Sequence, residues 1–162
     1  MNNIACIKKL AMNRYHGNLS AENGPAHWDR VWENAQILIP KTKANKTVVQ
    51  LFCYLHDCCS VYDGKEPEHG PAGAFFIKQN KELFSFLSEQ EFKLLVEACE
   101  KHAFHELSED PTIGTCWDAD RLDYGRYGIY PKVQFLSTEA AKDPDLIEKS
   151  YQRSITEVAQ AS

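Results

Sequence analysis

Long apolar runs are missing from this sequence of 162 residues. No stretch approaches the ~20 apolar residues that a helix needs to span a bilayer. The N-terminal segment "MNNIACIKKLAMNRYHG" also has no apolar core followed by a small-residue cleavage site. We therefore expect a cytoplasmic protein that has no membrane partner.

Positive charge is also scarce. The chain has 18 Lys and Arg against 23 Asp and Glu, which gives a formal net charge of −5, and it has no long Lys/Arg run. This balance argues against a protein that coats nucleic acid or an anionic membrane. A site for a small anionic ligand such as phosphate would have to be built locally.

Cysteine pairs of the zinc-binding kind are absent. The six cysteines include no C-x-x-C pair, which argues against a structural zinc knot. The adjacent Cys58 and Cys59, and Cys99 inside a helical pattern, suit small apolar core residues better than a disulfide framework. We expect all six cysteines to be reduced.

Sustained strand-like alternation is absent as well, and the apolar residues repeat with a helical period. A hydrophobic content of 43% and the absence of a linker predict one domain over residues 1–162. Ser88 and Glu91 form a capping box, and Pro144 occupies a favoured first-turn position. The predicted fold is all-α, with helices ending at Gly17 and at Pro40 and others at about 46–59, 71–79, 88–102, 115–125 and 144–159.

Several ionisable residues lie on or next to the apolar faces of these predicted helices, which are expected to point into the core. His27 shares a stripe with Val31, His56 and Asp57 end the most apolar helix, and His102 and Asp120 follow apolar stretches. One such histidine is usually a core residue satisfied by hydrogen bonds. Because buried unpaired charges cost several kcal/mol, the coincidence on separate helices favours a shared divalent cation.

The order of these residues resembles a known family. His27 in "HWDRV", His56-Asp57 in "YLHDCC" and an aspartate in "DADRLD" are similar to the H…HD…D pattern of the HD-domain superfamily of metal-dependent phosphohydrolases. The likeness covers about residues 24–130, and the segment "IGTCWDADRLDYGRYGI" resembles a small stand-alone branch. It implies an HD-domain-like helical bundle with a metal site in its core.

The resemblance also implies the ligands. A divalent ion (Mn, Fe, Co, Ni or Zn) would be held by His27, His56, Asp57 and Asp120. Asp118 lies about 200° around the helix from Asp120, so both carboxylates cannot reach one ion. Asp118 and Asp123 are therefore expected to be structural or to support the ligands by hydrogen bonds.

His69 and His102 fall where dinuclear members of the superfamily carry extra ligands. The resemblance leaves two roles open, either ligands of a second ion or contacts to the substrate phosphate, and we favour one ion with both histidines on the phosphate. Asp57 would orient the attacking water. An acidic residue that some nucleotidases of the superfamily carry soon after HD is missing, and Asp63 is the candidate to support the site in its place.

Three arginines lie close in sequence to these residues. Arg30 follows His27 by about one helical turn, and Arg121 and Arg126 follow Asp120, so each is a candidate to bind phosphate oxygens or to form an ion pair at the rim.

The predicted function is hydrolysis of a small phosphate ester, and nucleotides are among the candidate substrates. Two alternatives stay open: a dinuclear iron oxygenase of the HD type, built with His69 and His102, or an HD domain that binds a ligand without catalysis. The segment after His102, "AFHELSEDP", lacks the "GYP" sequence of cyclic-di-GMP phosphodiesterases. Cyclic di-GMP is therefore disfavoured as a substrate. The predicted partner is a small phosphorylated substrate, and the charge balance argues against nucleic acid.

Overall fold

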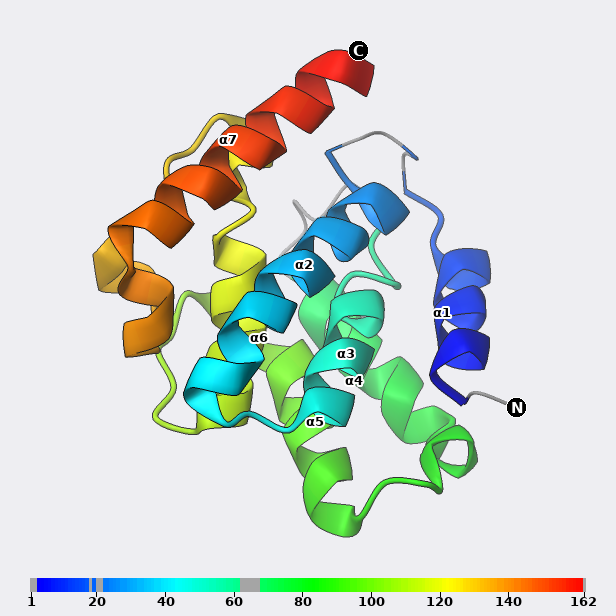
Figure 1. Ribbon diagram of the computed structural model, residues 1–162. Coiled ribbons are helices and arrows are strands. Elements are labelled where there is room, and N and C mark those ends of the chain that lie inside the picture. The colour runs from blue at the N-terminus through cyan, green and yellow to red at the C-terminus, as the bar shows by residue number, and fades with distance from the viewer. Residues whose placement is uncertain (1–2, 18, 20–21, 62–67, 162) are drawn as a thin grey trace.

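The most apolar helix of the sequence, α3 (Lys46–Leu55), is the centre of the fold in a computed structural model that describes residues 3–17, 19, 22–61 and 68–161 (Figure 1). Its side chains Val48, Leu51, Phe52 and Leu55 are completely buried. The side chain of Asn45 caps the helix by accepting a hydrogen bond from the backbone N–H of Val48. Helix α3 packs against α1, α2, α5 and α6, so its C-terminal end lies inside the bundle.

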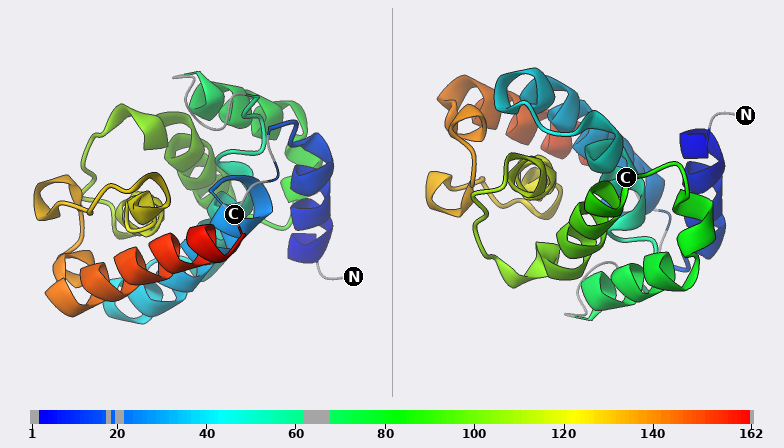
Figure 2. Two further views of the ribbon diagram at one scale, coloured as in Figure 1. Left: turned by 90° about the horizontal axis from the view of Figure 1, so that it is seen from above. Right: turned by 90° about the horizontal axis from the view of Figure 1, so that it is seen from below.

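The described residues form helices and no strands, which confirms the all-α prediction. Helix α7 lies along the outer side of α2, and α4 and α5 form a pair on the other side of α3 (Figures 1 and 2). The remaining α-helices are α1 (Asn3–Arg14), α2 (Gly24–Thr42), α4 (His69–Gln79), α5 (Glu89–Lys101), α6 (Pro111–Arg121) and α7 (Pro144–Ala161). Short 3-10 helices are η1 (Lys81–Phe84), η2 (His102–Phe104), η3 (Tyr124–Tyr127), η4 (Val133–Phe135) and η5 (Glu139–Lys142).

Several helix boundaries differ from the prediction. Helix α1 ends at Arg14 and not at Gly17, and α3 ends at Leu55 and not at residue 59. Helix α2 continues past Pro40 to Thr42, because a proline in the last turn removes only one backbone donor, and the helix ends where Lys43 adopts the left-handed conformation. Helix α6 begins at Pro111, earlier than the predicted piece at 115–125. The missed signal is Asp110, whose carboxylate caps the first turn, followed by proline at the first helical position.

The sequence spacing predicts that α7 buries the stripe of Ile147, Tyr151, Ile155 and Val158, and the observed buried face differs. Only Ile147 of that stripe is fully buried, and Leu146, Ser150 and Ser154 complete the buried face. Ser150 donates a hydrogen bond to Asn34, and Ser154 donates one to Asp123. This face therefore carries polar groups toward buried residues of α2 and of the segment after α6.

The cysteines are free thiols, and Cys53, Cys58, Cys99 and Cys116 are buried in the core. Among the described helices, none is long and apolar enough to cross a membrane.

Asp118 anchors the segment between α6 and α7. Its buried carboxylate accepts hydrogen bonds from the backbone N–H groups of Ser137 (2.7 Å) and Thr138 (2.8 Å) and from the Thr138 hydroxyl (2.7 Å). These contacts support a structural role for Asp118. Its carboxylate binds a different part of the molecule from that of Asp120, the other aspartate of the "DAD" sequence.

Replacing Asp118 with Ala should lower the free energy of unfolding by about 3 kcal/mol, because two backbone donors and a hydroxyl lose their charged acceptor. Urea denaturation measures this change. The control is Glu139→Ala in the same region, whose exposed ion pair with Lys142 should contribute less than about 0.5 kcal/mol. Equal stabilities of the two variants would contradict the anchoring role.

Candidate metal centre

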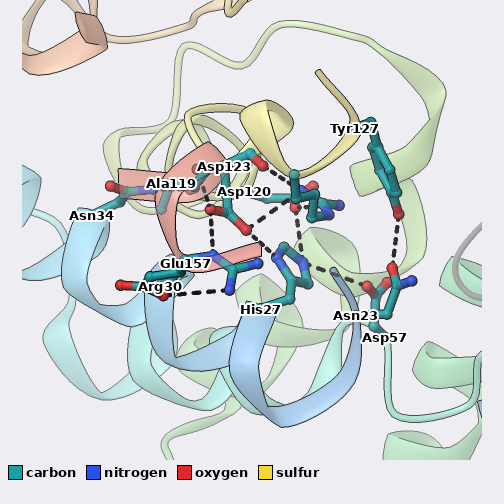
Figure 3. Close-up of polar contacts among 12 residues, drawn as sticks. Asn23, His27, Arg30, Asn34, Asp57, Ala119, Asp120, Asp123, Tyr127 and Glu157 are labelled. Carbon is teal, nitrogen blue, oxygen red and sulfur yellow. Dashed lines mark hydrogen bonds and ion pairs between the residues drawn. The ribbon is translucent and has the colours of Figure 1, made fainter. Parts of the chain in front are cut away.

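The imidazole of His27, near the start of α2, lies between carboxylates on two sides (Figure 3). Its Nδ1 atom is 2.7 Å from Oδ2 of Asp123. The same carboxylate accepts hydrogen bonds from Nε of Arg30 (2.8 Å) and from the Ser154 hydroxyl (2.6 Å). A carboxylate in this position holds the proton of His27 on Nδ1, so the Nε2 lone pair points into the cluster.

Asp123 is ionised in this setting. Burial acts to raise the pKa of its carboxyl group, but the hydrogen bonds from His27 and Arg30 and the charge of Arg126 outweigh burial and lower the pKa to about 2. Asp123 therefore orients His27, which agrees with the supporting role expected from the sequence.

His56 and Asp57 follow the last residue of α3. His56 Nδ1 lies 3.1 Å from the carbonyl oxygen of Phe52, which can only accept, so Nδ1 carries the proton. The Phe52 ring stacks on the imidazole, with centroids 4.8 Å apart. These contacts fix the His56 ring with its Nε2 lone pair 3.2 Å from Nε2 of His27.

The two carboxylate oxygens of Asp57 face different pairs of histidines. Oδ2 lies 3.6 Å from Nε2 of His27 and 3.4 Å from Nε2 of His56. Oδ1 lies 3.3 Å from Nε2 of both His69 and His102. Asp57 therefore joins two sets of potential ligands.

A close helix contact brings His69 to His102. His69 begins α4, and the next residue is Gly70, where a Cβ atom would lie 2.9 Å from the backbone oxygens of Cys99 and Glu100. The absence of a side chain lets α4 approach the end of α5 this closely. As a result, Nε2 of His69 lies 2.8 Å from Nε2 of His102.

The ring of His102 is oriented in the same way as that of His56. Its Nδ1 donates to the carbonyl oxygen of Cys99 at 2.7 Å, which leaves the Nε2 lone pair facing Asp57. Burial is the largest influence on His102 and lowers its pKa, which favours the neutral imidazole that metal ions bind.

Asp120 completes the cluster from the last turn of α6. Its Oδ1 atom lies 3.3 Å from Nε2 of His27 and 3.9 Å from Nε2 of His56. Burial acts to raise the pKa of this carboxyl group, but His27, Arg126 and His56 outweigh it and hold the pKa well below its usual range. Asp120 is therefore an ionised carboxylate beside two imidazoles.

The chemistry of this set fits divalent cations. The Nε2 lone pairs of three imidazoles face one another and two ionised carboxylates. These groups repel one another unless a cation lies between them. The ligand atoms form three overlapping groups, each within 4.8 Å: His27–His56–Asp57, His56–His102–Asp120 and Asp57–His69–His102. Burial lowers the pKa of His56, but Asp57 and Asp120 outweigh it and raise the pKa, so the cluster attracts positive charge.

The cluster opens on one side into a cavity of about 230 Å³. Arg126 is the one predicted phosphate-binding arginine among its lining residues. Nη2 of Arg126 lies 3.5 Å from Oδ1 of Asp120, and its guanidinium lies 4.5 Å from the centre of the Tyr127 ring. The lining residues are Asp57, His69, His102, Ala103, His105, Asp120, Tyr124, Arg126, Tyr127 and Ile129.

The other two arginines lie elsewhere. Arg30 is buried against Asp123, with a weaker contact from Nη1 to Glu157 at 3.5 Å. Arg121 donates from Nη1 to the carbonyl oxygen of Phe135 (2.8 Å) and from Nη2 to that of Glu106 (2.7 Å). The geometry therefore gives no support to the predicted phosphate contacts of these two residues.

Two further predictions concern supporting residues, and one residue that lines the cavity was not predicted. Asp118 binds residues 137 and 138 and makes none of the cluster's contacts, so it does not support the ligands directly. Asp63 lies outside the described residues. His105, which had no feature to single it out in the sequence, adopts the left-handed conformation just after η2 and lines the cavity.

Comparison with known proteins agrees with this geometry. The family model described as "HD domain" matches residues 26–148, well over half of the chain. The crystal structure of a predicted HD superfamily hydrolase from an uncultured Thermotogales bacterium is similar, with a TM-score of 0.68 and 21% identity over 99% of this chain and 90% of that one. A search of curated proteins gave no match. The chain belongs to the HD-domain family.

Proposed function

We propose that the protein is a metal-dependent phosphohydrolase that acts on a small phosphate ester. The observation that carries the proposal is a buried His/Asp cluster that opens into a cavity containing one arginine, Arg126. Family membership supports hydrolase chemistry at the level of the superfamily. The phosphate specificity is argued from Arg126.

His27, His56, Asp57 and Asp120 would hold one divalent ion. The sequence favoured a single ion, with His69 and His102 on the substrate. The equal distances from Asp57 Oδ1 to these two histidines support the alternative, in which they hold a second ion with Asp57 as the bridge. Mixed imidazole and carboxylate ligands suit Mn, Fe, Co, Ni or Zn ions, which lower the pKa of water and polarise the bond from phosphorus to oxygen.

Arg126 is suited to bind the phosphate. Burial acts to lower the pKa of its guanidinium, but Asp120 and Asp123 outweigh it and raise the pKa, so the group stays charged. Its buried Nε atom has no hydrogen-bond partner among the described residues. Tyr127 supports the plane of the guanidinium. Nη1 of Arg126 donates to the carbonyl oxygen of Asp123 at 3.2 Å, and the contact of Nη2 with Asp120 is long at 3.5 Å, so N–H groups on Nη2 remain for phosphate oxygens in the cavity.

The remaining steps use side chains that face the cavity. Asp57 accepts a hydrogen bond from the attacking water and orients it toward phosphorus. The water oxygen forms the new bond to phosphorus, the ester bond breaks, and the alcohol leaves with a proton. Arg126 stabilises the negative charge on the phosphate oxygens as this happens.

An oxygenase is the second candidate, because a cluster that can hold two ions also suits a dinuclear iron centre. Anaerobic loading with Fe²⁺, followed by measurement of O₂ consumption, separates the two activities. Hydrolysis of phosphate esters with several divalent ions, without uptake of O₂, supports the phosphohydrolase. A metal-loaded protein with neither activity would favour a domain that binds a ligand without catalysis.

The two-ion arrangement predicts the metal content of variants. The wild type should hold two ions per chain, and His69→Gln or His102→Gln should each lower the content toward one. Asp57→Asn should lose both ions, since Asp57 contributes to both sets. Elemental analysis of the purified proteins, after loading and removal of free metal, provides the count.

The matched control for metal content is Cys58→Ser, the residue next to Asp57. Its thiol is buried and has Cys59 as its hydrogen-bonding neighbour, so this change should lower stability by about 1–3 kcal/mol and leave the metal count unchanged. The one-ion arrangement would be supported if the wild type holds one ion and both His69→Gln and His102→Gln retain it.

Replacing Arg126 with Gln should lower kcat/KM for phosphate esters about tenfold to a hundredfold, because a charged hydrogen bond to phosphate contributes about 1.5–3 kcal/mol. The metal count should not change. The control is Arg153→Gln, whose guanidinium pairs with Glu33 outside the cavity. An unchanged kcat/KM in Arg126→Gln would remove this residue from the phosphate site.

A further inference from the structure

A second cavity lies beside the metal centre. It has a volume of about 340 Å³, within the range of about 300–1,000 Å³ that is usual for small-molecule sites. Its wall consists mainly of the segment at 129–136, which follows η3 and includes η4, together with residues near the end of α6. The mechanism proposed above makes no use of this cavity.

The two cavities share part of their lining. His105, Tyr124 and Ile129 line both of them. His105 and Ile129 are exposed and Tyr124 is half-buried, so the shared residues lie where the cavities reach the surface. The two cavities are therefore neighbours that meet at these three residues.

The chemistry of the second cavity differs from that of the first. Its far wall is apolar and largely aromatic, formed by Tyr130, Pro131, Phe135 and Leu136. Tyr130 and Phe135 remain 46% and 43% exposed, which is a large apolar surface to leave in water. Such a wall favours a flat, apolar group over a hydroxyl-rich one.

Two cations line this cavity, Arg121 and Lys132. Lys132 is exposed, whereas Arg121 is buried and already engaged. Arg121 donates hydrogen bonds from Nη1 and Nη2 to the carbonyl oxygens of Phe135 and Glu106. Its guanidinium lies 5.5 Å from the centre of the Trp117 ring. It fixes the wall of the cavity and does not present a free charge for a second phosphate. The cavity is therefore not a second phosphate site built on Arg121.

One helix end sets the distance between the two cavities. Along the last turn of α6, Asp118 binds residues 137 and 138, Asp120 faces the metal centre, and Arg121 binds Phe135. The metal ligand and the apolar wall are thus attached to the same rigid element. This arrangement suits a substrate of defined length that contacts both.

We propose that the second cavity binds the organic group of the phosphate ester and selects esters that carry an aromatic ring. This inference rests on the proposed phosphohydrolase function and adds the substrate class. The phosphate lies with Arg126 at the metal centre, the ester oxygen passes Tyr124 and Ile129, and the ring packs against Tyr130 and Phe135.

The test compares two esters with similar leaving groups, ethyl phosphate and 2-phenylethyl phosphate, on the metal-loaded protein. Both release an unactivated primary alcohol, so a difference reports the ring and not the chemistry. We expect kcat/KM to be at least tenfold higher for 2-phenylethyl phosphate. Phe135→Ala and Tyr130→Ala should each reduce that preference severalfold, measured as the ratio of kcat/KM for the two esters.

The control variant is Phe86→Ala, which removes a partly exposed phenylalanine that lines neither cavity. It should keep the full preference. Equal kcat/KM for the two esters in the wild type, or a preference that survives both cavity variants, would overturn the aromatic site while leaving phosphate hydrolysis in place.

Binding of 2-phenylethanol, measured by calorimetry, separates the two proposals. This alcohol has no phosphate, so its binding should be detectable in the wild type and in Arg126→Gln and should be weakened in Phe135→Ala. If neither ester is hydrolysed, the proposed function fails, and the alcohol still reports on the cavity. No binding of the alcohol to the wild type would overturn the aromatic site.

Discussion

The repulsion among buried groups in the core is the constraint on which this structure depends. Nε2 lone pairs of His27, His56 and His102 converge on the carboxylates of Asp57 and Asp120, and each imidazole is held in that orientation by a proton on Nδ1. The acceptors of those protons are a carboxylate and two backbone carbonyl groups. Moving these groups inside a packed bundle would disrupt the packing around them. The fold therefore holds these side chains in an orientation that suits a cation. Within the cluster, the Nε2 atoms and the carboxylates face only one another.

Helix α6 connects this cluster to the rest of the molecule. Its last turn carries three polar residues with separate tasks: Asp118 anchors the following segment, Asp120 faces the cluster, and Arg121 ties together two loops. Asp123, just beyond the helix, orients His27 from behind. The "DADRLD" sequence thus places within one short segment the candidate metal ligand Asp120, the carboxylate that orients His27, and the arginine that fixes the wall of the neighbouring cavity.

The sequence predicted the convergence of His27, His56, Asp57 and Asp120 because helical periodicity and the order of the motif are local properties. It did not predict the contacts of Arg30 and Arg121, whose partners are Asp123, Glu106 and Phe135 and lie about 14 residues or more away along the chain. The role of Asp57 as a link between two histidine pairs depends on how closely α4 approaches α5, and Gly70 alone is a weak signal of that contact. His105 enters the cavity lining through a left-handed backbone conformation that no sequence period reveals.

The most direct test of the central claim is to locate the ions. Crystals of the protein grown with Mn²⁺ should give two peaks of anomalous scattering per chain. One should lie among Nε2 of His27, Nε2 of His56 and Oδ2 of Asp57, and the other should lie among Oδ1 of Asp57 and the Nε2 atoms of His69 and His102. A single peak at the first position would leave His69 and His102 to the substrate, and no peak within the cluster would contradict the claim that these side chains share a cation.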